Sequence, residues 1–391
     1  MLKLIKSTFY REKETREKLA QFVKKTKRLS FSDECQVFEN SFSRYQGRKR
    51  SIFFNSGSSA NLALMQALLN TGMLKKGDKV GFSAVTWSTN VMPLIQLGLV
   101  PVPVDVELET LNVSTRTLKA ALKEHKLNAL FITNLLGFSS DIGEIAKLCR
   151  GKKIILLEDN CEALGSVYKK KKLGNFGLAS TFSFFVGHHM STIEGGMVCT
   201  DDKELAEMLG IVRAHGWDRN LKPEEKISLR KRFKKTTDFY AQYTFYDLGY
   251  NLRPTEIQGF LGNIQLKFLP EIIRKRSDNF KKISKAIYKR SDLYYPLRLG
   301  HMDFISNFAV PVICRSREIR DELVEKCKNS IEVRPVVGGD IVNQPFFRKY
   351  SKIRTSLPVA DLIHEQGIYF GNNPDMTGKE IEKIIKIFTS L

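Results

Sequence analysis

The sequence lacks clustered cysteines and long hydrophobic runs. Its six cysteines are scattered over 391 residues, and no two of them form a C-x-x-C pair. This scatter argues against a disulfide framework, a zinc ribbon or an iron–sulfur cluster. We therefore expect no bound metal and a reducing, cytoplasmic location. No stretch of about eighteen uncharged apolar residues occurs, so we predict no transmembrane helix and no membrane insertion. The first six residues turn polar before the apolar core of a signal peptide could develop.

Acidic residues are scarce relative to basic ones. The chain has 42 Asp and Glu against 63 Lys and Arg, a formal net charge of +21. A charge of this sign suits nucleic acid or an anionic membrane surface. The basic residues are spread widely, however, and no nucleic-acid motif or basic stretch interleaved with aromatic residues occurs. We therefore expect solvated, lysine-rich helix faces and no nucleic-acid partner, with a phosphorylated small substrate accounting for part of the charge.

Short apolar segments alternate with helix-like segments up to residue 200. Several of the apolar segments are continuous, which predicts strands buried on both faces, and the alternation predicts an α/β sheet flanked by helices. We expect a large domain over residues 1–265, of which roughly the first fifteen pack with the second domain, and a linker helix with a smaller α+β domain over residues 266–391. The predicted strands include residues 79–85, 100–106, 129–136, 153–159, 308–313 and 331–337, and a final helix spans 379–388.

A turn rich in serine and glycine follows the apolar residues 51–54. Residues 55–61 read N-S-G-S-S-A-N and lead into a helical pattern. Such a turn offers free backbone N–H groups, hydroxyls and the positive end of a helix dipole, which together suit a phosphate monoester. Gly57 and Ser58 are the candidate ligands. Simple capping of the helix is the alternative.

Two acids and a tryptophan stand near predicted strand ends. Asp159 ends a buried strand, with Glu162 three residues later, and a carboxylate at the end of such a strand lies where ligand sites form in α/β sheets. It can hold a pyridinium nitrogen protonated, or it can cap the next turn. The indole of Trp87 can stack on a flat cofactor ring or pack in the core.

His188 lies in residues 183–196, which read S-F-F-V-G-H-H-M-S-T-I-E-G-G. An imidazole titrates near neutrality and moves protons well, but it forms no stable imine. Further along the chain, Arg334 stands in an apolar strand, where it suits a phosphate or sugar oxygen or a salt bridge between domains.

Taken together, these segments resemble the fold-type-I, pyridoxal-phosphate-dependent nucleotide-sugar aminotransferases over nearly the whole chain. In that family a lysine stands at the position of His188, five residues after Ser183. The histidine pair in its place resembles the dehydratase branch of the family. The matching segments are residues 56–61, 87–89, 157–162, 181–183, 188–189, 194–196, 213–217, 249–251 and 334–335.

The resemblance implies a large domain with a mixed, mostly parallel sheet, a smaller C-terminal domain, and a homodimer with shared active sites. It also implies pyridoxal phosphate (PLP) and its pyridoxamine form (PMP) as cofactor, with His188 as the base. The implied phosphate ligands are Gly57, Ser58, Ser183 and, from the partner subunit, Asn251. Trp87 would cover the ring, Asp159 would bind its nitrogen and Glu162 would lie near its hydroxyl. The candidate substrate contacts are His215, Arg219 and Arg334, and His215 could instead lie at the dimer interface.

The implied reaction removes the C3 hydroxyl from a nucleotide-linked 4-keto-6-deoxyhexose, GDP-4-keto-6-deoxymannose in the most similar case. Glutamate would regenerate PMP, and the product would be a 4-keto-3,6-dideoxy sugar of the kind used in lipopolysaccharide O-antigens, such as colitose. Two alternatives stay open. One is a conventional nucleotide-sugar 4-aminotransferase with its lysine elsewhere, and the other is a catalytically silent PLP-binding paralogue.

The chain departs from its relatives at two places. Residues 217–233 contain no cysteine, although a related CDP-sugar dehydratase holds an iron–sulfur cluster just after the corresponding motif, so we expect no such cluster here. Val186 and Gly187 precede His188, where the resemblance to the dehydratase branch implies bulkier and more polar residues, and this difference bears on loop geometry and substrate fit.

Overall fold

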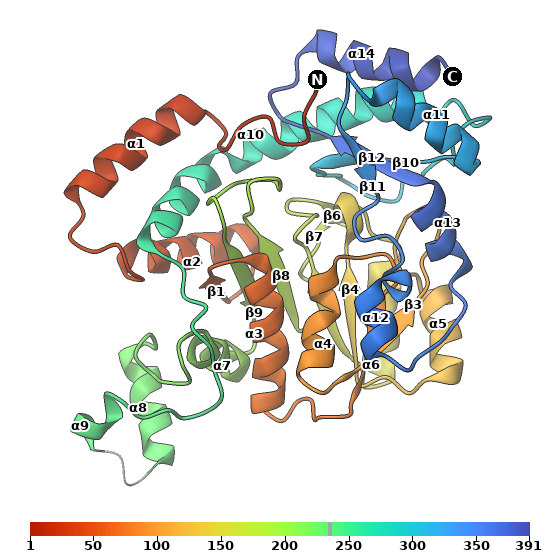
Figure 1. Ribbon diagram of the computed structural model, residues 1–391. Helices are drawn as coiled ribbons and strands as arrows, with labels where there is room; N and C mark the ends of the chain where they lie inside the picture. The colour runs from red at the N-terminus through yellow and green to blue at the C-terminus, as the bar shows by residue number, and fades with distance from the viewer. Residues whose placement is uncertain (234–236) are drawn as a thin grey trace.

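A seven-stranded sheet forms the centre of the molecule, as the computed structural model shows for residues 1–233 and 237–391 (Figure 1). Its strand order is β1-β9-β8-β5-β4-β2-β3, and only β9 runs antiparallel to its neighbours. The predicted α/β fold with a mixed, mostly parallel sheet is confirmed. The strands are β1 (Arg50–Phe54), β2 (Lys79–Ser83), β3 (Val100–Val104), β4 (Ala129–Thr133), β5 (Ile155–Asp159), β8 (Ala179–Ser183) and β9 (Gly196–Thr200).

Helices cover both faces of this sheet, because its strands are apolar on both sides. On β4, Leu130 and Ile132 join one apolar cluster, whereas Ala129 and Phe131 join another. This is the pattern of a strand buried on both faces. One face carries α3 (Gly57–Asn70), α4 (Met92–Gln96) and α7 (Lys203–Arg213), and the other carries α5 (Thr115–Glu124) and α6 (Ile142–Gly151).

The longest helix, α10 (Glu256–Ile287), connects the central sheet with the C-terminal part of the chain (Figure 1). It begins at a capping box formed by Thr255 and Gln258. Packed along its N-terminal half are α1 (Glu12–Lys25) and α2 (Asp33–Gln46), and the rings of Phe22 and Phe260 stack 4.2 Å apart. The predicted boundary at residues 265 and 266 falls inside α10, so the division into two domains stays a prediction.

A three-stranded antiparallel sheet of order β10-β12-β11 lies above the central sheet in Figure 1. It confirms the predicted strands at 308–313 and 331–337, and the last helix confirms the one predicted at 379–388. The N-terminal segment reaches this part of the fold, because Leu2 forms a parallel bridge with Ile331. The elements are β10 (Ala309–Ile313), α11 (Arg317–Cys327), β11 (Val333–Pro335), α12 (Pro345–Tyr350), α13 (Pro358–Gln366), β12 (Gly367–Gly371) and α14 (Gly378–Thr389).

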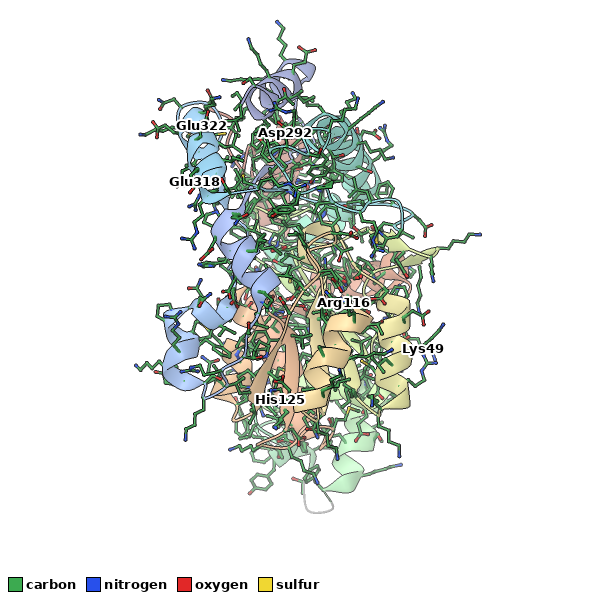
Figure 2. All side chains as sticks on the ribbon, turned by 90° about the vertical axis from the view of Figure 1, so that its right-hand side faces the viewer. Lys49, Arg116, His125, Asp292, Glu318 and Glu322 are labelled. Carbon is green, nitrogen blue, oxygen red and sulfur yellow. The ribbon has the colours of Figure 1, made fainter. Side chains whose placement is uncertain are left out.

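Smaller elements complete the chain. A hairpin of β6 (Val167–Tyr168) and β7 (Lys171–Lys172) follows β5, and α8 (Pro223–Arg232) and α9 (Asp238–Ala241) form an outlying group after α7. Charged side chains, Lys49, Glu318 and Glu322 among them, lie at the outside of the fold (Figure 2). Within the described ranges, no helix combines the length and apolar character needed to cross a membrane.

Candidate active site

A cavity of about 440 Å³ lies between the central sheet and the C-terminal sheet. Its floor is formed where β5 and β8 end, and where β1 leads into α3, which is the edge at which α/β sheets bind ligands. Phe308, Arg334 and Tyr369 line it from the C-terminal sheet, and the N-terminal residues Leu4 and Ile5 complete the wall. The site therefore draws on segments from both ends of the chain.

The N-terminus of α3 forms one end of this cavity. Ser56 caps the helix, since its hydroxyl accepts a hydrogen bond of 3.0 Å from the N–H of Ser59. Gly57, Ser58 and the buried Ser183 line the cavity beside it. A Cβ on Gly57 would lie 2.7 Å from the Cβ of Ser183, so this approach requires glycine. Free N–H groups of the first helical turn and two serine hydroxyls fit a phosphate group, so the capping and phosphate interpretations are compatible.

Asp159 ends β5 as a buried carboxylate held by neutral donors. Its Oδ2 accepts hydrogen bonds from the side-chain amides of Asn90 at 2.7 Å and Asn61 at 3.0 Å. Its Oδ1 accepts one of 2.8 Å from the N–H of Cys161. Among the described residues, no lysine, arginine or histidine forms an ion pair with it. A buried anion without a cation suits a ligand that brings its own positive charge, such as a pyridinium nitrogen.

Glu162 is a second buried acid at the same edge. It accepts a 2.8 Å hydrogen bond from the N–H of Leu136, and it lines the cavity with Asp159. Burial, with a smaller contribution from the charge of Asp159, raises the pKa of Glu162 to about 8. Near neutral pH the carboxyl group is therefore mostly protonated and can donate a hydrogen bond to an oxygen in the cavity.

Trp87 follows β2 and borders the cavity with 54% of its surface exposed. This exposure argues against core packing, one of the two interpretations of the sequence, and leaves the indole free to cover a flat ring. The loop that carries it is fixed from both sides. Thr86 shares a hydrogen bond of 2.6 Å with Thr133, and the carbonyl of Thr86 accepts from the N–H of Gly338.

His188 lies on the loop between β8 and β9 and lines the cavity. Its backbone N–H donates a 2.9 Å hydrogen bond to the carbonyl of Phe185, and the centroid of its ring lies 5.1 Å from that of Phe308. Burial, together with the nearby charge of Arg276, lowers the pKa of His188 to about 4, so the imidazole is neutral at physiological pH and can accept a proton. None of the described residues that line the cavity is a lysine.

Arg334 lines the cavity but already has a carboxylate partner. Its Nε and Nη2 both donate to Oε1 of Glu332, at 3.0 and 2.5 Å. The other oxygen of Glu332 accepts from the N–H of Leu4 at 2.9 Å. This ion pair joins two residues of the same segment and is not the salt bridge between domains that the sequence offered as an alternative, and the side chain of Arg334 keeps a place at the cavity wall.

His215, Arg219 and Asn251 do not line this cavity. They form a separate group, because Ala214 bridges to Asn251 and the N–H of His215 donates to the carbonyl of Tyr250 at 2.7 Å. Arg219 lies over the ring of Trp217, 4.2 Å from its centroid. Within one chain, the roles predicted for these three residues stay predictions.

Several residues of the site were not predicted from the sequence. Asn90, Thr133 and Tyr369 line the cavity without any recognisable motif. The position of Asn90 could have indicated its place at the site, since it stands three positions after Trp87 on the same loop. For Leu4 and Ile5 the sequence predicted packing with the second domain but not a place at the cavity.

Comparison with known proteins agrees with this geometry. Residues 10–389 match the family described as the DegT/DnrJ/EryC1/StrS aminotransferase family. GDP-4-keto-6-deoxy-D-mannose 3-dehydratase of Escherichia coli O55:H7 is 35% identical over 375 residues, with 95% of each chain covered. The solved structure of E. coli GDP-4-keto-6-deoxy-D-mannose-3-dehydratase with bound hydrated PLP superposes with a TM-score of 0.88 at 32% identity, covering 99% of both chains. A structure of GDP-4-keto-6-deoxymannose-3-dehydratase with a trapped PLP–glutamate geminal diamine gives a TM-score of 0.89, also at 32% identity, covering 99% of this chain and 100% of that one.

Proposed function

The chain belongs to the DegT/DnrJ/EryC1/StrS aminotransferase family, and from this premise we propose that it is a PLP-dependent nucleotide-sugar 3-dehydratase. The reaction removes the C3 hydroxyl from a nucleotide-linked 4-keto-6-deoxyhexose and gives a 4-keto-3,6-dideoxy sugar. The proposed substrate is GDP-4-keto-6-deoxymannose, because the relative that shares 35% identity carries that name. Glutamate is the proposed amino donor, supported by the PLP–glutamate geminal diamine trapped in a similar structure.

The observation that carries the proposal is the neutral imidazole of His188 in a cavity lined by no lysine among the described residues. An aminotransferase needs a lysine amine to hold its cofactor covalently between turnovers. An imidazole cannot do so, and it leaves the cofactor free to remain in the amine form. A general base without a tether is suited to elimination of a hydroxyl rather than to completed amino transfer.

The residues that line the cavity would have different chemical roles. Gly57, Ser58 and Ser183 would hold the cofactor phosphate at the N-terminus of α3. Asp159 would hold the ring nitrogen, and Trp87 would shield one face of the ring from water. When bound, the cofactor supplies an amine that condenses with a ketone and a ring that accepts electrons.

His188 would move the proton. Its neutral imidazole would accept a proton from the carbon that bears the cofactor's amine and then donate it to the departing C3 hydroxyl oxygen. The protonated carboxyl group of Glu162 would donate a hydrogen bond to the ring hydroxyl and hold the ring in place.

We also propose a homodimer in which Asn251 completes the partner's phosphate site. Asn251 is exposed and lies outside its own chain's cavity. The segment just before it carries an unusually exposed apolar surface, and surfaces of this kind mark protein contacts. It consists of Phe239, Tyr240, Tyr243, Phe245 and Leu248, each at least 60% exposed. A cytoplasmic location is proposed as well, since all six cysteines are free thiols.

Mass spectrometry tests the proposed reaction. The protein would be incubated with PLP, glutamate and GDP-4-keto-6-deoxymannose, with the CDP- and dTDP-linked 4-keto-6-deoxy sugars in parallel. Dehydration predicts a sugar that has lost one oxygen atom, together with equal amounts of 2-oxoglutarate and ammonia. The three parallel incubations rank the nucleotides by rate.

Each alternative gives a different product. A conventional 4-aminotransferase would yield an amino sugar and 2-oxoglutarate without ammonia, and borohydride would trap a cofactor–lysine adduct. A silent paralogue would bind PLP but release neither 2-oxoglutarate nor a changed sugar. Either result would refute the dehydratase proposal.

A further inference from the structure

Arg276, on α10, is a buried cation without a carboxylate partner. The residue is 6% exposed, and in the described ranges it forms no ion pair. Its guanidinium instead donates to backbone carbonyls. Nη2 donates to the carbonyl of His188 at 3.0 Å, and Nη1 donates to the carbonyl of Asn372 and, at 3.5 Å, to that of Phe308. Its Nε is buried without a partner among the described residues.

A buried charge without a counter-ion loses several kcal/mol of hydration, which the hydrogen bonds to the three carbonyls offset in part. Burial lowers the pKa of Arg276 to about 9, which leaves it charged at neutral pH. The acid whose charge raises the pKa of Arg276, Asp375, is partly exposed and lies 4.0 Å from the amine of Lys275.

The three carbonyls come from three different parts of the site. His188 belongs to the loop after β8, Phe308 precedes β10 and Asn372 follows β12. The side-chain amide of Asn372 in turn donates a 2.8 Å hydrogen bond to the backbone carbonyl of Arg276. A planar guanidinium with five N–H donors can bind all three segments at once, which a single-centre ammonium cannot do in the same geometry.

We propose that Arg276 is a positioning residue that fixes the His188 loop against the C-terminal sheet and places a positive charge behind the imidazole at neutral pH. This inference rests on the proposed function of His188 as the base. The guanidinium contacts the backbone carbonyl of His188, and His188 lines the cavity, which Arg276 does not.

The positive charge of Arg276 is important because acidic groups around His188 would favour protonation of its imidazole. Asp159 and Glu162 at the end of β5, and Glu194 on the same loop, line the cavity and would favour a protonated imidazole when ionised. The charge of Arg276 has the opposite effect on His188. The second histidine, His189, is buried, with its Nε2 3.1 Å from the carbonyl of Ser306. The remaining charged or titratable groups that line the cavity are Cys161, Arg334 and Tyr369.

Burial and then Arg276 lower the pKa of His188. Removing the cation should raise that pKa, since a neighbouring positive charge disfavours the imidazolium. The base would then be protonated over more of the acidic range. The acidic limb of the kcat/KM profile should move to higher pH, while the KM for the sugar changes little.

Three variants separate charge from geometry. Arg276→Gln removes the charge, and Arg276→Lys keeps it but loses the planar fork. Arg274→Gln is the control, because Arg274 lies on the same helix with 66% of its side chain exposed and faces Asp278 at 3.7 Å. The pKa of His188 would be measured by NMR on protein labelled in its histidine rings, with the signal assigned by its absence in His188→Asn. This titration requires no turnover.

We expect Arg276→Gln to raise the pKa of His188 by about one unit or more, and Arg274→Gln to leave it unchanged. Arg276→Lys should keep the pKa near its original value and lower kcat by about fivefold or more without changing KM, because the three-carbonyl contact is lost. Equal pKa values for His188 in Arg276→Gln and Arg274→Gln would overturn the proposal. So would full kcat in Arg276→Lys, which decides the question if the glutamine variant does not fold. Failure of the dehydratase proposal would show differently, as a lack of sugar turnover in the unmodified protein while the NMR shift persists.

Discussion

The side-chain amide of Asn90 donates a 2.7 Å hydrogen bond to the carboxylate of Asp159 at the floor of the cavity. The orientation of this amide is fixed, because its oxygen accepts from the hydroxyl of Thr86 at 3.0 Å. Asn61 donates to the same carboxylate oxygen. Asp159 is therefore aimed by neighbours that carry no charge, and its negative charge remains available to a cationic ring nitrogen.

Replacing Asn90 with leucine should weaken cofactor binding. The substitution removes a donor to a buried carboxylate and frees Asp159 to rotate, which typically lowers affinity about tenfold or more. PLP titration followed by absorbance measures the effect. Asn343→Leu is the matched control, because its amide also donates to a carboxylate, that of Asp361 at 2.7 Å, but outside the cavity. Equal PLP affinities in the two variants would contradict the role given to Asn90.

Glu162 should make the stability of the cofactor-free protein depend on pH. Folding raises its pKa from an ordinary 4.5 to about 8, so the native state binds the proton more tightly than the unfolded chain does. This contribution is fully present below pH 4.5 and is lost as pH rises through 8. Between about pH 5 and 9 the unfolding free energy of the original protein should fall by roughly 2–4 kcal/mol relative to Glu162→Gln.

Urea unfolding at a series of pH values measures this difference. Glu144→Gln serves as the control, since Glu144 is a half-exposed residue paired with Lys147 on the surface. Its curve should run parallel to that of the original protein. If the Glu162→Gln curve does the same, the carboxyl group is not buried in the protonated form.

Residues whose role follows from local sequence were predicted, and those whose role follows from distant contacts were not. The strand ending at Asp159 is apolar over most of its length, so both its burial and the position of the acid could be expected. His188 stands at a fixed distance from Ser183 within one segment, and Trp87 stands directly after a strand. Each of these positions depends on neighbours in the chain.

Long-range contacts leave no such pattern. Arg276 meets His188 across 88 positions, and Leu4 meets Glu332 across 328. A buried arginine bonded to carbonyls looks in the sequence like any other basic residue on α10, where lysines and arginines are common. For Arg334 the sequence indicated a salt bridge but not its partner, because Glu332, two residues away in the chain, could also have turned its side chain toward solvent or toward a distant segment.

Mixing two inactive variants should test whether the site is shared between subunits. His188→Asn lacks the base, and Asn251→Ala lacks the proposed contact to the partner's phosphate. In a mixed dimer, one site would combine an intact His188 with an intact Asn251 from the other chain. After complete exchange of subunits, about a quarter of the original activity should return, since half of the dimers are mixed and each has one working site.

Activity of each variant alone and of the mixture would be measured after dilution from mild denaturant. The same mixture made with Tyr243→Asp and Leu248→Asp added to both chains is the control, because charges on the exposed apolar surface should prevent association. No recovery in the unmodified mixture, with both variants shown to be dimers, would place Asn251 outside the partner's site.

His188→Asn should abolish dehydration while the cofactor still binds. Asparagine is polar and of similar size, so the cavity keeps its shape, but the amide cannot accept a proton at neutral pH. Loss of a general base lowers the rate by about 10²–10⁴-fold. Single-turnover mass spectrometry of the sugar measures the rate, and PLP absorbance measures binding. An asparagine variant with full turnover would remove His188 from the reaction.

His188→Lys tests whether the position itself is the one that normally tethers the cofactor. The ring of His188 lines the cavity with Ser183 and Asp159, and a lysine amine on the same backbone should reach a bound aldehyde. We expect a new absorbance band and, after borohydride reduction and proteolysis, a cofactor adduct on the peptide that contains residue 188. A matched lysine at Phe185, which also lines the cavity on the same loop, should give no such adduct. If the adduct forms at 185 and not at 188, the loop is oriented differently from the arrangement described, and the absence of a tether could no longer be assigned to the histidine.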